Sequence, residues 1–136
     1  MKRKGVNISV SGPEYGTYTN LPSGFALYAN IENTTHELME VSLVDFYIIS
    51  AGRQQSPLYC LDGYSFEQEH LLANTLKTVG KIFTTSGLNN DKLYSGDYII
   101  IKLKINAKEF RMFKFVYEVG FLEEGWRLDD YSEVSL

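Results

Sequence analysis

Cysteine and histidine are the side chains best suited to metal binding and nucleophilic catalysis. Here they are scarce: the chain has only Cys60, His36 and His70. Zinc sites and catalytic triads need several such groups, and common signatures space them as C-x-x-C or H-x-x-x-H. No two of the three stand at such a spacing. We therefore expect no metal site and no catalytic residue of this kind, and we expect Cys60 to be a small buried apolar residue.

Asp45 is the one charged residue in an apolar stretch that runs from Val41 to Ser50. If the odd-numbered residues of this stretch face the core, Asp45 is buried with them and becomes a candidate general acid. If the even-numbered residues face the core, Asp45 lies in water. The pattern allows both registers, and no second carboxylate with a clear role accompanies Asp45.

Cofactor signatures are equally sparse. Asn89, Asn90, Asp91 and Asp97 could offer oxygen ligands to calcium, but the alternation of an EF-hand loop is missing and a polar turn is expected there. The early glycines are too dispersed for a phosphate-binding loop, and neither Gly-Lys-Ser nor Gly-Lys-Thr occurs. The sequence therefore indicates no cofactor.

Aromatic residues are in excess, with ten tyrosines, eight phenylalanines and one tryptophan. Several fall in expected loops or near strand ends, where exposed rings can anchor a protein partner or stack on sugar faces. The alternative is that they only cover the ends of sheets. The candidate contact residues are Tyr15, Tyr18, Tyr64, Phe66, Tyr94 and Trp126.

The charge balance excludes some partners and leaves the location open. The net charge of −4 argues against nucleic-acid binding, which needs a basic patch. No run of about 18 apolar residues is present, so no membrane insertion is expected. The location is extracytoplasmic or at the cell surface if an export signal was trimmed before Met1, and cytoplasmic otherwise.

Hydrophobic periodicity predicts a single all-β domain over residues 1–136, in which 1–4 and 128–136 are candidate mobile ends. The clearest element is a hairpin from Tyr98 to Val119. Residues 11–23 contain Gly12-Pro13 and Pro22 and read as a long loop, whereas 66–73 allow a short helix or a covering loop. Further strands are expected at 6–10, 25–32, 41–50, 58–61 and 76–84. About seven short strands favour an antiparallel two-sheet sandwich.

Three segments resemble immunoglobulin-like domains: Ala29–Thr35, where an apolar strand ends at Asn-Thr-Thr; Val41–Gly52; and the Ser95–Tyr98 turn. Over residues 25–118 the chain is similar to the uncharacterised immunoglobulin-like domains of Gram-positive bacterial lipoproteins and secreted proteins. The resemblance implies an adhesion or interaction module without catalysis. The chain departs from that pattern because it lacks a lipid-attachment cysteine near its start and the Cys…Trp…Cys arrangement of antibody domains.

Three functional hypotheses follow. The first is a non-enzymatic interaction or adhesion module that binds a protein partner through loop aromatics or a sheet edge. The second is a carbohydrate-binding module with a glycan as ligand, and the third is an enzyme that uses Asp45. A coplanar pair of exposed rings would favour the sugar, and a contiguous apolar patch or an open edge would favour the protein. Asp45 at the bottom of a polar pocket would favour the enzyme.

Overall fold

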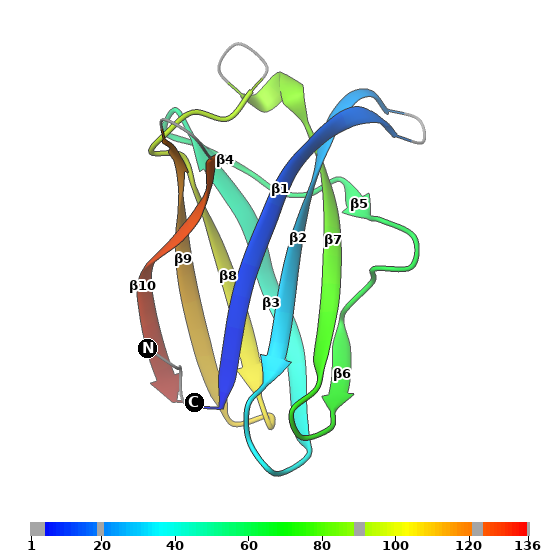
Figure 1. The fold of residues 1–136 in the computed structure, drawn as a ribbon, viewed down its shortest axis with the longest axis vertical. Coiled ribbons are helices and arrows are strands. Elements are labelled where there is room, and N and C mark those ends of the chain that lie inside the picture. Colours follow the sequence, from blue (N-terminus) through cyan, green and yellow to red (C-terminus); the bar gives the residue numbers. More distant parts are fainter. Residues whose placement is uncertain (1–4, 19–20, 89–91, 121–123, 136) are drawn as a thin grey trace.

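The computed structural model of the chain describes residues 5–18, 21–88, 92–120 and 124–135. They form two antiparallel sheets packed face to face, with no α-helix in the described part (Figure 1). The predicted all-β antiparallel sandwich is therefore confirmed. The described residues form ten strands, where the sequence predicted about seven.

The smaller sheet has four strands in the order β1-β2-β7-β5, with bounds β1 Val6–Tyr18, β2 Leu21–Asn33, β5 Tyr59–Cys60 and β7 Leu76–Thr84. The larger sheet has the order β10-β9-β8-β3-β4, and β6 also pairs with β3. Its strands are β3 Met39–Ser50, β4 Arg53–Gln55, β6 Gln68–Leu71, β8 Tyr98–Ile105, β9 Glu109–Val119 and β10 Glu124–Ser135. A 3-10 turn, η1 at Thr85–Gly87, follows β7.

The core fills the space between the sheets with residues that alternate along each strand. On β2 the residues buried between the sheets are Phe25, Leu27, Ala29 and Ile31, every second residue of the strand expected at 25–32. The hairpin of β8 and β9 confirms the clearest prediction, and buries Ile99, Ile101, Leu103, Ile105, Phe113, Phe115 and Tyr117. This one-sided burial is the expected result of a period of two.

Two local predictions were wrong. Residues 66–73 contain no helix, because Gln68–Leu71 is the strand β6, paired with one end of β3. The expected long loop at 11–23 is mostly strand, since β1 runs to Tyr18 and β2 begins at Leu21. A bulge between Ser11 and Glu14 takes up the Gly12-Pro13 pair, so these residues bend the strand without ending it.

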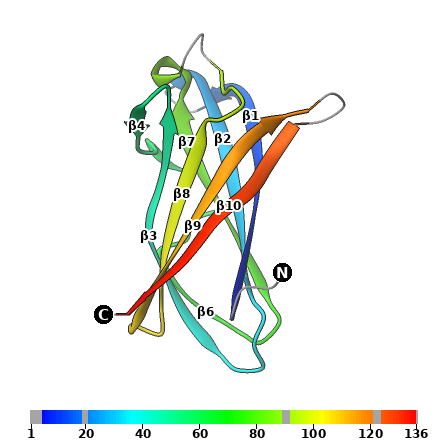
Figure 2. The ribbon, with the colours of Figure 1, turned by 90° about the vertical axis from the view of Figure 1, so that its left-hand side faces the viewer.

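The strand β10 was missed because its sequence is acidic and carries few apolar residues. The sequence pattern ended at Val119, yet β10 pairs with the whole of β9 and forms one edge of the larger sheet (Figure 2). Its Trp126 packs on Tyr117 with ring centroids 4.9 Å apart and donates a hydrogen bond to the carbonyl oxygen of Gly12 at 3.0 Å. This contact joins the edge of one sheet to the edge of the other.

The strand β3 resolves the two registers that the sequence allowed for Asp45. A bulge between Leu43 and Asp45 shifts the alternation of β3. Before the bulge the odd-numbered Val41 faces the core, and after the bulge the even-numbered Phe46 and Ile48 face it. Asp45 is exposed. Residues 1–4 lie outside the described residues, and no helix among those described is long and apolar enough to cross a membrane.

Candidate functional site

The structure divides the six candidate aromatic residues into three groups. Phe66 and Trp126 belong to the first, because both contribute mainly to packing. Phe66 is a core residue with 1% of its surface exposed, so the expectation of a contact residue there was wrong. Trp126 is half-buried against Tyr117 and holds β10 to β1 through its indole N–H.

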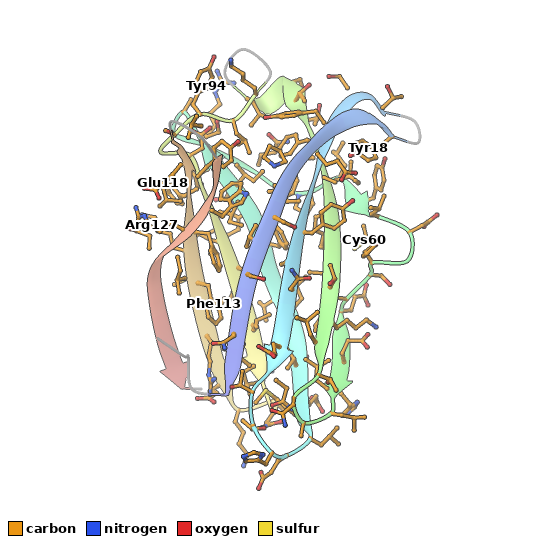
Figure 3. The ribbon with its side chains drawn as sticks, in the orientation of Figure 1. Tyr18, Cys60, Tyr94, Phe113, Glu118 and Arg127 are labelled. Atoms are coloured by element: carbon orange, nitrogen blue, oxygen red, sulfur yellow. The ribbon has the colours of Figure 1, made fainter. Side chains whose placement is uncertain are left out.

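Tyr15 and Tyr94 form the second group, at the end of the sandwich where Figure 3 labels Tyr94. Tyr15 packs on Phe25 with a centroid distance of 5.8 Å, and its hydroxyl accepts a hydrogen bond from the Leu93 N–H at 2.9 Å. The Nζ of Lys92 lies 5.2 Å from the ring centroid of Tyr94. Together with Ser95, Tyr117 and Val119 these side chains line a groove of about 430 Å³.

Tyr18 and Tyr64 form the third group, on the outer face of the four-stranded sheet, where Tyr28 and Tyr59 join them. We call these four tyrosines, together with Glu14, the tyrosine surface. Tyr64 is 42% exposed and the other three tyrosines are half-buried. The rings of Tyr28 and Tyr64 meet edge to face, with centroids 5.5 Å apart and an interplanar angle of 73°.

Strand register builds this surface. Paired residues of antiparallel strands share a face, so one row across the sheet places Glu14, Ala26, Ile82 and Tyr59 on the outer side. Ala26 and Ile82 are nonetheless fully buried, which indicates that larger side chains cover them. The surface is therefore a packed layer of rings.

The neighbouring row pairs Tyr28 with Gly80. A Cβ atom at Gly80 would lie 3.1 Å from the Tyr28 ring and 3.2 Å from the Cβ of Tyr64. The backbone N–H of Gly80 also donates to the carbonyl oxygen of Tyr64 at 2.9 Å. The absence of a side chain at Gly80 lets the segment that carries Tyr64 lie directly on the sheet.

Glu14 is the charged centre of the tyrosine surface. The Tyr28 hydroxyl donates to its Oε1 at 3.4 Å, and the Tyr18 hydroxyl donates to its backbone carbonyl oxygen at 2.5 Å. Partial burial, followed by the negative charge of Glu14, raises the pKa of Tyr18 and the pKa of Tyr28. Both phenols are therefore neutral hydrogen-bond donors over the physiological pH range.

Beyond the tyrosines, small neutral residues make up most of the outer face of this sheet. Asn30 donates to the Ser9 hydroxyl at 3.2 Å and accepts from the Thr78 hydroxyl at 2.5 Å, which forms a polar ladder across three strands. None of the strand-paired residues that face outward from the described part of this sheet is lysine or arginine. Among these paired, described residues the face carries the carboxylates of Glu14 and Glu32.

The other chemical candidates do not come together. Cys60 is half-buried and its Sγ accepts from the Nζ of Lys81 at 2.9 Å. His36 is exposed, and His70 lies 3.5 Å from Glu40. Among the described residues no group of three metal-ligating side chains converges.

Asp45 and Asp97 have different surroundings. Asp45 lines a polar groove, but its own exposure removes the burial on which the general-acid hypothesis depended. Asp97 accepts hydrogen bonds from the Ser50 hydroxyl and the Tyr94 N–H, both at 2.9 Å, so it stabilises a turn. Its suggested partners at 89–91 lie outside the described residues.

Sequence reasoning missed Tyr28, Glu14 and Gly80 as parts of the surface. In the strand expected at 25–32, alternation puts Tyr28 on the side opposite Phe25 and Leu27, and this is a signal that its ring lies on an outer face. Glu14 and Gly80 carried no comparable signal, because the bulge in β1 and the approach of Tyr64 to β7 depend on tertiary structure.

No protein-family model matches the chain, and no curated protein matches it. Among solved structures, the chain is similar to one described as a crystal structure of a protein from Archaeoglobus fulgidus. The match covers 96% of this chain and 95% of that one, with 12% sequence identity and a TM-score of 0.38. These comparisons assign no family to the chain, and its description as a two-sheet all-β domain rests on its own structure.

Proposed function

We propose that this domain is a non-enzymatic interaction module that binds a protein partner through the tyrosine surface. One observation carries the proposal: four tyrosines cluster beside the Glu14 carboxylate on an outer sheet face, where the strand-paired residues that the structure describes include no lysine or arginine. Tyrosine, serine, asparagine and glycine dominate this face, and these are the residues that antibody binding sites favour. The resemblance to immunoglobulin-like surface modules is in keeping with such a role.

The chemistry of the surface favours a partner that presents arginine or lysine. A guanidinium or ammonium group is attracted to the faces of tyrosine rings and gains further from a nearby carboxylate. Glu14 supplies that carboxylate beside Tyr18 and Tyr28: the Tyr28 hydroxyl donates to the carboxylate, and the Tyr18 hydroxyl donates to the backbone carbonyl oxygen of Glu14. Rigid tyrosine rings also lose little conformational entropy on binding.

The ring geometry does not favour the carbohydrate hypothesis. A flat sugar face stacks best on a ring, or on rings that share a plane, and the Tyr28 and Tyr64 rings are tilted by 73°. A protein side chain can reach between rings in this arrangement. The sugar hypothesis is therefore an alternative outcome of the test below.

The test selects binders from a display library of random linear peptides with the unmodified domain and then measures them against variants. The double substitution Tyr28→Ser and Tyr64→Ser removes the two rings that meet edge to face. We expect the selected peptides to be rich in arginine and to bind the double variant at least about 30-fold more weakly, as for removal of binding hot spots.

A matched control removes exposed apolar side chains elsewhere. Leu76 and Met112 are 55% and 38% exposed, Leu76 at the far end of the same face and Met112 on the opposite sheet. The substitutions Leu76→Ser and Met112→Ser should leave binding unchanged. If the selected peptides bind the double tyrosine variant as tightly as the unmodified domain, the proposal is wrong. Tyrosine-dependent binding on a glycan array, without peptide binding, would instead establish the sugar alternative.

A further inference from the structure

The outer edge of β3 is paired at its two ends and open between them. Residues Met39–Ser42 pair with β6, and Ile48–Ser50 pair with β4. The strands β4 and β6 lie toward opposite ends of the sandwich (Figure 1). Between them the chain leaves the sheet to form β5 on the other layer, so the edge strand of the larger sheet is interrupted in its middle.

The backbone of Phe46 points into this gap. Ser50 and Arg53 pair across the tight turn between β3 and β4, and alternate residues of β3 direct their N–H and C=O groups to the same edge. That alternation includes Phe46. On the far side of the bulge, the Leu43 N–H is bonded to the carbonyl oxygen of Glu67 at 2.8 Å. Among the described residues no backbone partner occupies the edge at Phe46.

A groove runs along this open edge. It has a volume of about 490 Å³, which is within the range of ligand-binding clefts. Its floor is β3 from Leu43 to Tyr47, and its ends are formed by Ser56 and Pro57 on one side and Phe66 and Glu67 on the other. The groove therefore lies along the open edge of β3, so a further extended chain has space beside the backbone groups of Phe46.

The charges at the groove favour a cationic occupant. The side chains of Asp45 and Glu67 are exposed, and both line the groove. The cation that lines it, Lys81, donates its Nζ to the Sγ of Cys60 at 2.9 Å. The lining of the groove thus includes two carboxylates and one lysine, and the ammonium group of that lysine has a partner within the chain.

We propose that this groove, the β3 slot, binds a short extended peptide segment that completes the edge of the larger sheet and carries basic side chains. The added strand places one residue opposite Phe46, and the two exchange backbone hydrogen bonds. The residues on either side of it share the face of Asp45, where a lysine meets the carboxylates. The slot lies on a different sheet from the tyrosine surface and does not depend on it.

A designed peptide, acetyl-Thr-Lys-Val-Lys-Thr-amide, tests the proposal. Its valine is intended to lie opposite Phe46, and its lysines near Asp45. The control peptide carries an N-methyl group on that valine, which removes the strand hydrogen bond and keeps the charge. Binding is followed by NMR titration and by hydrogen exchange at the Phe46 amide. We expect saturable binding, slower exchange at Phe46, and at least about tenfold weaker binding of the methylated peptide.

Matched variants separate this site from general attraction to an acidic domain. Asp45→Asn should weaken binding, whereas Glu37→Gln, an equal charge change at an exposed position outside the groove, should not. The double variant Tyr28→Ser and Tyr64→Ser should bind the peptide as the unmodified domain does. Equal binding of the two peptides, or an unchanged Phe46 amide, would overturn the proposal and leave the tyrosine surface untouched.

Discussion

The outer faces of the two sheets use aromatic rings in opposite ways. On the six-stranded sheet the chain's own lysines lie over the rings: Lys102 is 4.6 Å from the centroid of Phe110, and Lys114 is 4.3 Å from that of Tyr98. On the four-stranded sheet, within the described residues, no cation of the chain lies over Tyr18, Tyr28 or Tyr64.

Ion pairs add to this difference. Lys114 lies 3.6 Å from Asp129, and Arg127 lies 3.1 Å from Glu118. Figure 3 labels Glu118 on β9 and Arg127 on β10. Cations on the larger sheet are thus already engaged by rings and carboxylates of the chain. On the smaller sheet the tyrosine rings and Glu14 offer the faces and the carboxylate that a cation contacts, and a partner can supply that cation.

The largest expected effect comes from the strand that carries Glu14 and Tyr18. Gly12 has a φ of +109°, and a Cβ atom there would lie 2.7 Å from the carbonyl oxygen of Ala26. Gly12→Ala should therefore destabilise the fold by about 2–4 kcal/mol, measured by denaturant unfolding. At Gly16 the nearest atom would be 3.9 Å away, so Gly16→Ala is the matched control. Equal stability of the two variants would contradict this account of β1.

A charge change tests the comparison between the faces more directly. Glu14→Lys gives the tyrosine surface a cation of its own, as on the six-stranded sheet, and removes its carboxylate. We expect arginine-rich peptides selected on the unmodified domain to bind this variant at least about tenfold more weakly. Glu32→Lys makes the same charge change at the far end of the same face. Similar losses in both variants would show that net charge, and not the tyrosine surface, decides binding.

Alkaline titration gives a smaller effect. The pKa values of Tyr18 and Tyr28 are raised above the usual 10.0, first by burial and then by Glu14. A raised folded-state pKa stabilises the fold below the unfolded pKa, and this stabilisation is lost as the pH rises through the folded value. Ultraviolet absorbance, followed as the pH is raised, should show some phenols that ionise above the usual range. The double variant Tyr18→Phe and Tyr28→Phe should have fewer of these phenols. If the variant instead loses absorbance change only from the phenols that ionise in the usual range, the assignment is wrong.

The smallest effect is expected on the six-stranded sheet. Lys102→Met keeps the aliphatic stem over Phe110 and removes the charge, so about 0.5–1 kcal/mol of stability should be lost. Lys108→Met changes an exposed turn residue and serves as the control. Thermal unfolding of the two variants compares them, and equal melting temperatures would show that the lysine over the ring contributes nothing.

Sequence reasoning was most successful where burial alone decides the structure. Alternation in 25–32 and in the hairpin from Tyr98 to Val119 identified strands and inward residues, because a half-buried strand has a period of two. It failed at β10, which is held by ion pairs and by Trp126, and at Gly12-Pro13, where a bulge keeps the strand continuous. Neither feature leaves a hydrophobic period.

The candidate surface was predicted in part, for a related reason. Tyr18 and Tyr64 were chosen as exposed aromatic residues, and the structure brings them to one face. Tyr94 was chosen on the same ground and lies in a different groove, and Phe66 is buried. A tyrosine in a loop has the same sequence signal whether it packs inward or outward. Only strand register and the contacts of Tyr64 with Tyr28 and Gly80 show which tyrosines share a face.

The most direct test of the central claim is an NMR titration of the domain, with its tyrosine rings isotopically labelled, against an arginine-rich peptide from the selection. The account predicts that the ring signals of Tyr18, Tyr28 and Tyr64 shift together with one saturation curve. The signals of Tyr98, covered by Lys114, and of Tyr94 should stay in place. Saturable shifts at Tyr98 or Tyr94, with unchanged signals at the tyrosine surface, would contradict it.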